Sequence, residues 1–245
     1  MIYVTGDMHG DWVHRLNMDS FPEQKEMTKE DYVIICGDFG IWNNSSKENI
    51  NLKWLDARNF TTLFVDGNHE NYDVLDSFEI KKWHGGNVHF IKPSVIHLTR
   101  GQVFNIDNKL IFSFGGAASH DIRDGILDKN DPKIKRWKKD NSKEFRINHV
   151  SWWKSEMPNE EEMYEGRENL RKVEDKIDFV ISHCAPSSTQ AIMSCGVYKP
   201  DKLTQYFEGI KAFIDYNKWF FGHYHRDQQI TNKEICLFKQ IIRIA

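Results

Sequence analysis

The chain has 245 residues, a length that favours one large domain over two. Its formal net charge of −3 argues against a protein that coats nucleic acid or an anionic membrane, and its four scattered cysteines include no CxxC pair of the kind that forms a zinc knuckle. The sequence opens directly into an apolar run and contains no stretch of about 20 apolar residues, so we expect a cytoplasmic protein without a membrane partner.

The first third of the chain alternates between apolar runs and helical patterns. Strands are predicted at residues 1–5, 31–36 and 61–65, and helices at residues 47–58 and 71–78. The second strand is a continuous apolar run, which is typical of a strand buried on both faces of its sheet. Strands and helices that alternate at this spacing predict stacked α/β layers.

The middle of the chain has a different pattern. Four short apolar runs, at residues 88–91, 95–98, 103–106 and 110–114, are separated by turn-forming residues and predict an antiparallel meander that forms a second sheet. Residues 115–157 show no regular pattern, and we predict a long insertion there that covers the site as a lid. Trp152 and Trp153 would pin this lid to the body of the protein.

The last third predicts two helices and the remaining strands. The first helix lies within residues 158–175, with Asn159 as its N-cap and Glu162 three residues later, as in a capping box. A strand at 177–181 is expected to return to the main sheet, and strands at 218–221 and within 235–244 complete the fold. The second helix is indicated by apolar residues at helical spacing, namely Leu203, Phe207, Ile210 and Ile214.

Five of the apolar runs end in side chains that bind metal ions. Residues two apart in an extended backbone point to the same side, so the pairs at 7/9 and 223/225 can each address one ion or two neighbouring ions. Carboxylate, carboxamide and imidazole ligands together suit Mn²⁺, Fe or Zn²⁺. The strand ends therefore predict one polynuclear site, in which Asp38 can bridge two ions about 3.5–4 Å apart. The residues at these ends are Asp7 and His9, Asp38, Asn68 and His69, His183, and His223 and His225.

The motifs at these strand ends resemble, in order and spacing, those of the calcineurin-like metallophosphoesterase superfamily. They are Gly-Asp-x-His-Gly at 6–10, Gly-Asp at 37–38, Gly-Asn-His-Glu at 67–70, the histidine at 183 and Gly-His-x-His at 222–225. Residues 37–42 and 151–153 are also similar to a bacterial and phage branch of that superfamily. The resemblance implies a single α/β (α+β) domain over residues 1–245, built as a four-layer αββα sandwich of two mixed β-sheets flanked by helices.

The resemblance also implies two divalent metal ions, Mn²⁺ first, with Fe, Zn²⁺ and Ni²⁺ as alternatives. The implied reaction is in-line attack of a metal-bridging hydroxide on the phosphorus of a phosphomonoester or phosphodiester. His69 would act as general acid or orient the phosphate, so that His69 and Asp38 are the implied catalytic residues. One ion would be held by Asp7, His9, Asp38 and His225, and the other by Asp38, Asn68, His183 and His223.

The chain departs at two positions from the protein Ser/Thr phosphatases of the superfamily. Residues 40–42 and Asp66 stand where those enzymes carry phosphate-binding arginines, which argues against a phosphoprotein substrate. We therefore expect a small phosphoester or nucleotide-like substrate. Its predicted contacts are Asn68, His120 and Arg123, the last through a forked contact to phosphate.

Two other functions stay open. A nuclease of the same superfamily is the alternative within the enzyme class, with the basic run at residues 133–139 as its nucleic-acid contact, although such runs are more often solvated faces. A protein-binding scaffold without catalysis is the alternative from another class, although the chain keeps every ligand position and His69. The sequence does not determine the oligomeric state.

Overall fold

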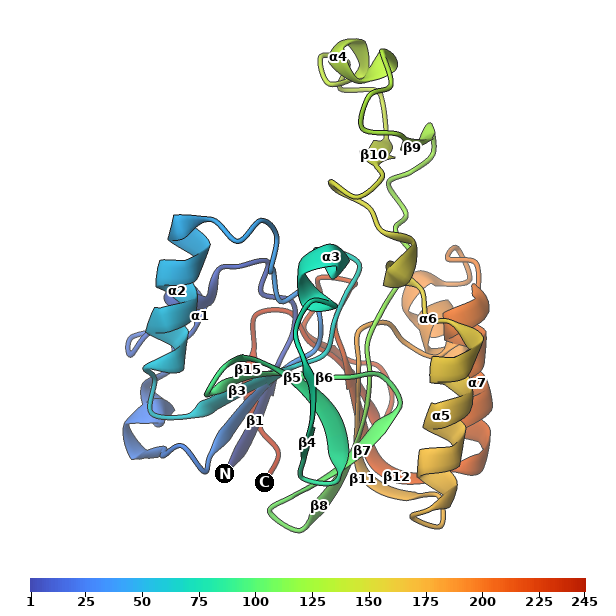
Figure 1. Ribbon diagram of the computed structural model, residues 1–245. Helices are drawn as coiled ribbons and strands as arrows, with labels where there is room; N and C mark the ends of the chain where they lie inside the picture. The colour runs from blue at the N-terminus through green and yellow to red at the C-terminus, as the bar shows by residue number, and fades with distance from the viewer.

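Two β-sheets pack face to face between two layers of helices in the computed structural model, which describes residues 1–245 (Figure 1). The first sheet is mixed, with a parallel centre and antiparallel strands at both edges. Its strands are, in spatial order, β15 (Ile241–Arg243), β1 (Ile2–Thr5), β2 (Tyr32–Ile35), β3 (Thr61–Phe64), β6 (Val95–Leu98), β5 (Gly86–Lys92) and β4 (Ile80–Trp83).

The second sheet is mixed in the same way, with four parallel strands between two antiparallel edge strands. Its strands are, in spatial order, β13 (Gln228–Gln229), β14 (Glu234–Cys236), β12 (Asp215–Phe221), β11 (Lys176–Ser182), β8 (Lys109–Phe114) and β7 (Gln102–Ile106).

Helices cover the outer face of each sheet, one group on either side of the sandwich in Figure 1. The four-layer αββα arrangement that the motifs implied is therefore confirmed. The first sheet is covered by α1 (Trp12–Arg15), α2 (Ser46–Asp56) and the 3₁₀ turn η1 (Pro22–Glu26), with α3 (Tyr72–Leu75) following β3. The second is covered by α5 (Glu160–Arg171), α6 (Ser187–Ser194) and α7 (Lys202–Phe213). No helix combines the length and the apolar composition that crossing a membrane requires.

Three apolar cores fill the spaces between the four layers. Strand β2 shows how one short run serves two of them, because successive side chains of a strand point to opposite faces. Val33 and Ile35 pack under the outer helices, whereas Ile34 faces the second sheet. All four residues of β2 are buried, as its continuous apolar run predicted.

The capping box predicted for the helix within residues 158–175 is also confirmed. The Asn159 side chain accepts a hydrogen bond from the Glu162 backbone N–H, and the Glu162 side chain accepts one from the Asn159 N–H, which forms a capping box at the start of α5. The apolar stripe within residues 203–214 forms the buried face of α7.

Two predicted strand arrangements are wrong. The runs between residues 88 and 114 form two hairpins rather than one meander, because β6 pairs with β3 in the first sheet whereas β8 pairs with β11 in the second. The two hairpins face each other across the central core. Strand β11 likewise joins the second sheet, not the sheet of β1 to β3. Sequence patterns also missed β4, whose side chains are mostly exposed, and α6.

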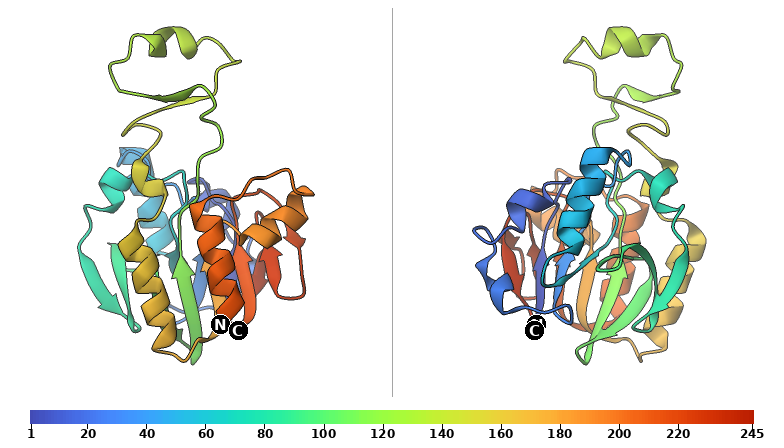
Figure 2. Two further views of the ribbon diagram at one scale, coloured as in Figure 1. Left: turned by 90° about the vertical axis from the view of Figure 1, so that its right-hand side faces the viewer. Right: turned by 60° about the vertical axis from the view of Figure 1, so that its left-hand side comes forward.

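The middle of the segment 115–157 forms an arm that stands away from both sheets, whereas its two ends pack against the body (Figures 1 and 2). The prediction that this segment lacks regular structure is wrong, since it holds the strand pair β9 (Gly125–Leu127) and β10 (Phe145–Ile147), the helix α4 (Lys133–Trp137) and the 3₁₀ turn η2 (Lys154–Glu156). No side chain of α4 is buried, so the tip does not fold across the body as a lid. Trp153 is buried in the core of the first sheet and anchors the base of the arm, as expected.

Candidate metal centre

The predicted ligands meet at the edge where the parallel strands of both sheets end. They lie on loops after the carboxyl ends of β1, β2 and β3 in the first sheet and of β11 and β12 in the second. Two contacts join the sheets there: Nδ1 of His183 lies 2.8 Å from the Cys36 carbonyl oxygen, and the His223 backbone N–H donates to Oδ1 of Asp7 at 2.9 Å. Because Nδ1 of His183 donates to a carbonyl, its Nε2 is left free to bind a cation.

Asp7, His9, Asp38 and His225 form a first group of ligand atoms, all within 4.8 Å of one another. Nε2 of His225 lies 3.1 Å from Oδ2 of Asp7 and 3.0 Å from Nε2 of His9. Nε2 of His9 lies 3.8 Å from Oδ2 of Asp38. Two carboxylates and two imidazoles converging on one point form a donor set that suits a divalent transition-metal ion.

Asn68, His183 and His223 form a second group on the other side of Asp38. Nε2 of His183 lies 3.2 Å from Oδ1 of Asn68 and 3.4 Å from Oδ1 of Asp38. The His223 ring is centred 5.0 Å from the His183 ring. The two oxygens of Asp38 therefore face different groups, Oδ2 toward His9 and Oδ1 toward His183.

A hydrogen-bond chain from the base of the arm orients Asn68. Its Nδ2 donates to the Ser119 hydroxyl at 3.4 Å, and that hydroxyl donates to a carboxylate oxygen of Glu156 at 2.7 Å. The Ser119 backbone N–H donates to the other Glu156 oxygen at 2.8 Å. Since the amide nitrogen of Asn68 is engaged by Ser119, its oxygen faces His183, where a ligand oxygen is needed.

The backbone at the centre is held in an unfavourable conformation. Four of the ligand residues have left-handed φ angles: His9 (47°), Asp38 (43°), His223 (67°) and His225 (50°). Each such angle costs a side-chain-bearing residue on the order of 1–3 kcal/mol, and such residues cluster where function requires an exact side-chain direction. Their concentration here marks the loops as shaped for the site rather than for stability.

Two glycines allow the ligands to approach one another. A Cβ atom on Gly37 would lie 2.1 Å from Nδ1 of His183, and one on Gly67 would lie 2.1 Å from Oδ1 of Asp38. Gly37 also has a φ of +93°, which L side chains rarely adopt. The glycine before each of these ligands is therefore required by close packing as well as by the turn.

The electrostatics of the centre favour bound positive charge. Burial raises the pKa of Asp38, but the imidazoles of His183, His69 and His9 outweigh it and hold that pKa well below the ordinary range. Burial lowers the pKa of His183, yet Asp38 and Asp7 raise it to about 10. Both carboxylates therefore favour positive charge at His183, and a divalent cation bound at its Nε2 would compete with a proton there.

Glu70 holds the loop that follows Asp38. Its carboxylate is buried and accepts hydrogen bonds from the backbone N–H groups of Phe39 (2.6 Å), Gly40 (3.1 Å) and Ile41 (3.2 Å). Burial and the charge of Asp38 raise the Glu70 pKa, and these three donors oppose that rise. The last residue of Gly-Asn-His-Glu is therefore a positioning residue, a role that the motif alone did not reveal.

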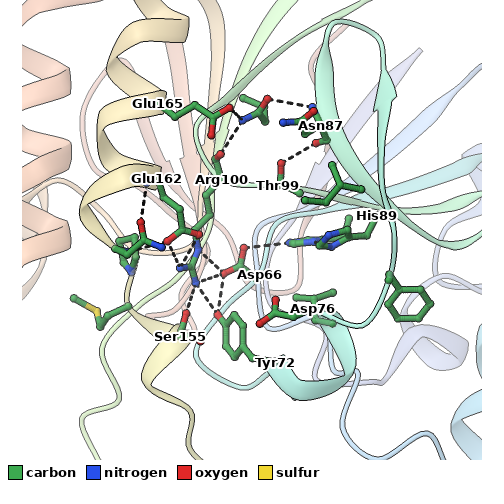
Figure 3. A pocket seen from close by; sticks show the side chains of 18 of the residues that line it. Asp66, Tyr72, Asp76, Asn87, His89, Thr99, Arg100, Ser155, Glu162 and Glu165 are labelled. Atoms are coloured by element: carbon green, nitrogen blue, oxygen red, sulfur yellow. Dashed lines mark hydrogen bonds and ion pairs between the residues drawn. The ribbon is translucent and has the colours of Figure 1, made fainter.

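Asp66 lies in a buried ion pair behind the turn that carries Asn68 (Figure 3). Arg100 donates to Oδ2 of Asp66 from Nε at 2.9 Å and from Nη2 at 2.5 Å, and the Tyr72 hydroxyl donates to the same oxygen at 2.8 Å. Nε2 of His97 lies 3.2 Å from Oδ1. Through these buried contacts Asp66 holds the turn that carries Asn68. This role explains why an aspartate rather than an arginine occupies position 66.

Comparison with known proteins assigns this chain to a family. A sequence model of the calcineurin-like phosphoesterases matches residues 1–227. The chain belongs to this family. Among solved structures it is similar to the phosphopantetheinyl hydrolase from Mycobacterium tuberculosis, with 14% sequence identity, coverage of 97% of this chain and 89% of that chain, and a TM-score of 0.46. A comparison with curated proteins found no match.

The other predicted site residues of this calcineurin-like phosphoesterase are His69, His120 and Arg123, and only the two histidines lie beside the centre. The ring of His69 is centred 5.4 Å from that of His9, and the ring of His120 lies 6.0 Å from that of His223, so both border the centre. Arg123 is exposed on the arm, where its Nε lies 3.7 Å from a Glu144 oxygen, and it is not brought to the histidines. Burial lowers the pKa of His69, which leaves a neutral imidazole with one N–H to donate at pH 7.

Arg146, on β10 in the middle of the arm (Figure 1), was not identified from the sequence. It donates to both carboxylate oxygens of Asp121, at 2.9 and 2.5 Å. Burial lowers the pKa of His69, and the positive charge of Arg146 lowers it further. No feature of the linear sequence distinguishes Arg146 from Arg123. In the pairing of β9 with β10, Arg146 lies opposite Ile126.

Proposed function

We propose that this chain is a dinuclear metal-dependent phosphoesterase of small phosphomonoesters or phosphodiesters. The observation that carries the proposal is the position of Asp38, whose two oxygens face the two ligand groups. One ion would be held by Asp7, His9, Asp38 and His225, and the second by Asp38 with three further ligands, Asn68, His183 and His223. Mn²⁺ is the first candidate, since the ligands are hard oxygens and imidazoles without thiolate.

The cations would supply charge to neutralise the phosphoryl oxygens and to acidify a water molecule. The side chains of the protein would hold the ester and its leaving group in position. His69 borders the first ligand group, and its backbone N–H donates to Oδ1 of Asp38 at 2.8 Å, which fixes the imidazole relative to the bridging carboxylate. As a neutral imidazole, His69 can donate its N–H to the oxygen of the leaving group and orient the ester. To protonate that oxygen as the bond to phosphorus breaks, it would first have to take up a proton, and the charge of Asp38 favours that protonated form.

We assign the phosphate-binding arginine to Arg146 rather than to Arg123. Arg146 is mostly buried, its charge lowers the pKa of His69, and its guanidinium is held in a fixed direction by Asp121. A planar guanidinium held in this way can donate to a phosphate oxygen without losing much conformational freedom.

Four free cysteines, three of them buried, support a cytoplasmic location.

The proposal is tested by a substrate panel with added Mn²⁺. The panel contains p-nitrophenyl phosphate, bis-p-nitrophenyl phosphate, cyclic nucleotides and single-stranded DNA. Wild type should hydrolyse at least one of the small esters, and Asp38→Asn and His69→Ala should each lower kcat/KM by at least about 100-fold. His84→Asn, a change at an exposed histidine away from the centre, is the matched control. Full turnover by Asp38→Asn would show that the assigned roles are wrong.

A nuclease is the second candidate, and one observation favours it. The basic residues of α4 and the residues after it are exposed at the tip of the arm, above the edge where the metal centre lies. A nuclease should cleave the single-stranded DNA of the panel, and charge reversal of Lys135 and Lys139 should abolish that cleavage while hydrolysis of small esters continues. Absence of any DNA cleavage by wild type dismisses this candidate.

A further inference from the structure

A pocket of about 890 Å³, here called the α5 pocket, opens between α5 on one side and α3 with β5 on the other (Figure 3). Its volume is at the large end of the range found for sites that bind small molecules. No ligand of the candidate metal centre lines it, whereas Asp66 does. A molecule bound in the α5 pocket would therefore lie apart from the metal ligands, behind the turn that Asp66 holds.

One buried side chain in the wall of the α5 pocket has an unpaired nitrogen. His89 of β5 is only 7% exposed, and its one side-chain hydrogen bond joins its Nδ1 to Nδ1 of His97 at 3.1 Å. Nε2 of His89 is left without a partner in the protein. It can be reached from the pocket, because it is not among the unpaired polar atoms that are sealed from solvent. Buried polar groups are nearly always paired, so this nitrogen calls for a partner from a ligand.

The hydrogen bonds behind His89 determine which kind of partner its Nε2 needs. Nε2 of His97 lies 3.2 Å from Oδ1 of Asp66, a carboxylate oxygen that can only accept, so this nitrogen carries the one proton of a neutral His97 ring. Nδ1 of His97 must then accept, and Nδ1 of His89 must donate. Burial and the neighbouring His97 lower the pKa of His89 to about 4, so its ring is neutral at pH 7. His89 therefore presents a lone pair at Nε2, which matches a hydrogen-bond donor and disfavours an anion.

The charges around the α5 pocket favour a donor that is positively charged. Five carboxylates but only three basic side chains line the pocket. Two of the three basic groups, Arg100 and Lys202, already pair with carboxylates of the same wall, and the third, Lys154, is exposed. Asp76 and Glu165 pair with no basic group, and Glu165 accepts only the neutral Nε2 of a glutamine. A cationic ligand would supply the partners that these two carboxylates lack.

We propose that the α5 pocket binds a polyamine, an elongated molecule whose ammonium groups are joined by methylene chains. One N–H would donate to Nε2 of His89, and the ammonium charges would lie against Asp76 and Glu165, which stand on opposite sides of the pocket in Figure 3. Apolar side chains that line the pocket, among them Phe78 and Met157, would cover the methylene chains. A divalent metal ion matches less well, because the only group of three or more carboxylate and imidazole atoms within 4.8 Å of one another is at the metal centre.

Calorimetric titration with spermidine and putrescine tests the α5 pocket without depending on turnover. Both amines should bind the wild-type protein, whereas 1,4-butanediol, which has the length of putrescine without its charges, should bind at least about tenfold more weakly than putrescine. The titrations are run with Mn²⁺ present, so that the carboxylates of the metal centre are not free to take up amine. Absence of spermidine binding, or displacement of spermidine by an equal concentration of Mg²⁺, overturns the inference.

The role of His89 is tested by substitution. His89→Asn keeps an N–H donor beside His97 and removes the ring nitrogen that faces the α5 pocket, so it should weaken spermidine binding about tenfold. His84→Asn, at an exposed histidine outside the pocket, is the matched control and should bind spermidine within about twofold of wild type. Wild-type affinity in folded His89→Asn overturns the inference.

The two unpaired carboxylates provide a second test, which stays decisive if His89→Asn does not fold. Asp76→Asn combined with Glu165→Gln removes two charges at exposed positions of the pocket wall and should weaken spermidine binding about tenfold. The matched control is Asp19→Asn combined with Glu161→Gln, which removes two exposed charges outside the pocket and should change the affinity less than about twofold. Equal losses of affinity in the two double variants overturn the inference.

Discussion

Nε2 of His183 lies 3.4 Å from Oδ1 of Asp38, although the two residues follow strands of different sheets. The central apolar core between the sheets sets this distance, because both β2 and β11 contribute side chains to it. The geometry of the candidate metal centre is thus a product of sheet packing, and it should be sensitive to small changes where the two sheets touch.

Gly37→Ala should disrupt that contact directly. The new Cβ would lie 2.1 Å from Nδ1 of His183, and the backbone φ of +93° disfavours alanine, so His183 must move away from Asp38. We expect kcat/KM for the best ester to fall at least about tenfold and one of two bound Mn²⁺ ions to be lost. Gly209→Ala is the control: it lies within α7 with no atom near the new Cβ, and should stabilise the fold by about 0.5–1 kcal/mol. Wild-type metal binding by Gly37→Ala would contradict the packing account.

Glu70→Ala should destabilise the protein by about 3 kcal/mol or more. It leaves three buried backbone N–H groups at residues 39–41 without an acceptor, and each was bonded to a carboxylate. Urea unfolding at pH 7 measures this change. Glu168→Ala, which removes a surface pair with Arg171 on α5, should change stability by less than about 0.5 kcal/mol. Equal effects of the two substitutions would exclude the positioning role of Glu70.

The Asp66–Arg100 pair should show strong coupling. Arg100→Met leaves a buried carboxylate without its main partner and should cost about 3–5 kcal/mol, whereas the double change Asp66→Asn with Arg100→Met should cost less than the sum of the single changes. Additive effects in urea unfolding would contradict a direct pair.

The same pair predicts a pH dependence. Burial raises the Asp66 pKa, but Arg100 and His97 outweigh it and lower that pKa below its ordinary value. For a carboxyl whose pKa is lowered in the folded state, the added stability is present above the unfolded pKa of about 4 and is lost as the pH falls below it. The free energy of unfolding of wild type, relative to that of the double variant, should therefore decrease as the pH falls from about 5 to about 2.

Arg146 and Arg123 offer a matched comparison within the arm. Arg146→Ala should raise KM for the best ester about tenfold, since a charge-assisted contact to phosphate is lost, and Arg146→Lys should recover only part of the affinity. Arg123→Ala removes an exposed pair with Glu144 and should change KM less than about twofold. The opposite ranking of the two alanine variants in steady-state kinetics would return the phosphate contact to Arg123.

The sequence predicts this fold and centre well where local patterns carry the information. The apolar run of β2 and the capping box of α5 are local signals, and each lies where it was expected. The strand-end ligands are local signals as well: four of them, Asp7, His9, Asp38 and His225, come together, and their metal-binding role stays a prediction. Sheet membership is not local: β6 and β8 have similar runs, and only their pairing with β3 or β11 separates them. For the same reason the sequence pointed to Arg123, whereas Arg146, to which we assign the phosphate contact, lies on a strand pair that no pattern indicated.

The sequence did not reveal the residues that support the ligand turns, because their role depends on how deeply their side chains are buried. Glu70 and Asp66 look like surface carboxylates in the sequence, and only their burial shows that they hold the turns around Asp38 and Asn68.

Metal stoichiometry tests the central claim most directly. Protein freed of metal and then equilibrated with Mn²⁺ should retain two ions per chain, and Asp38→Asn, which weakens the one ligand shared by both groups, should lower the affinity for both. His84→Asn should retain two. One tight ion in the wild type, or two ions bound as tightly by Asp38→Asn as by wild type, would contradict a centre bridged by Asp38.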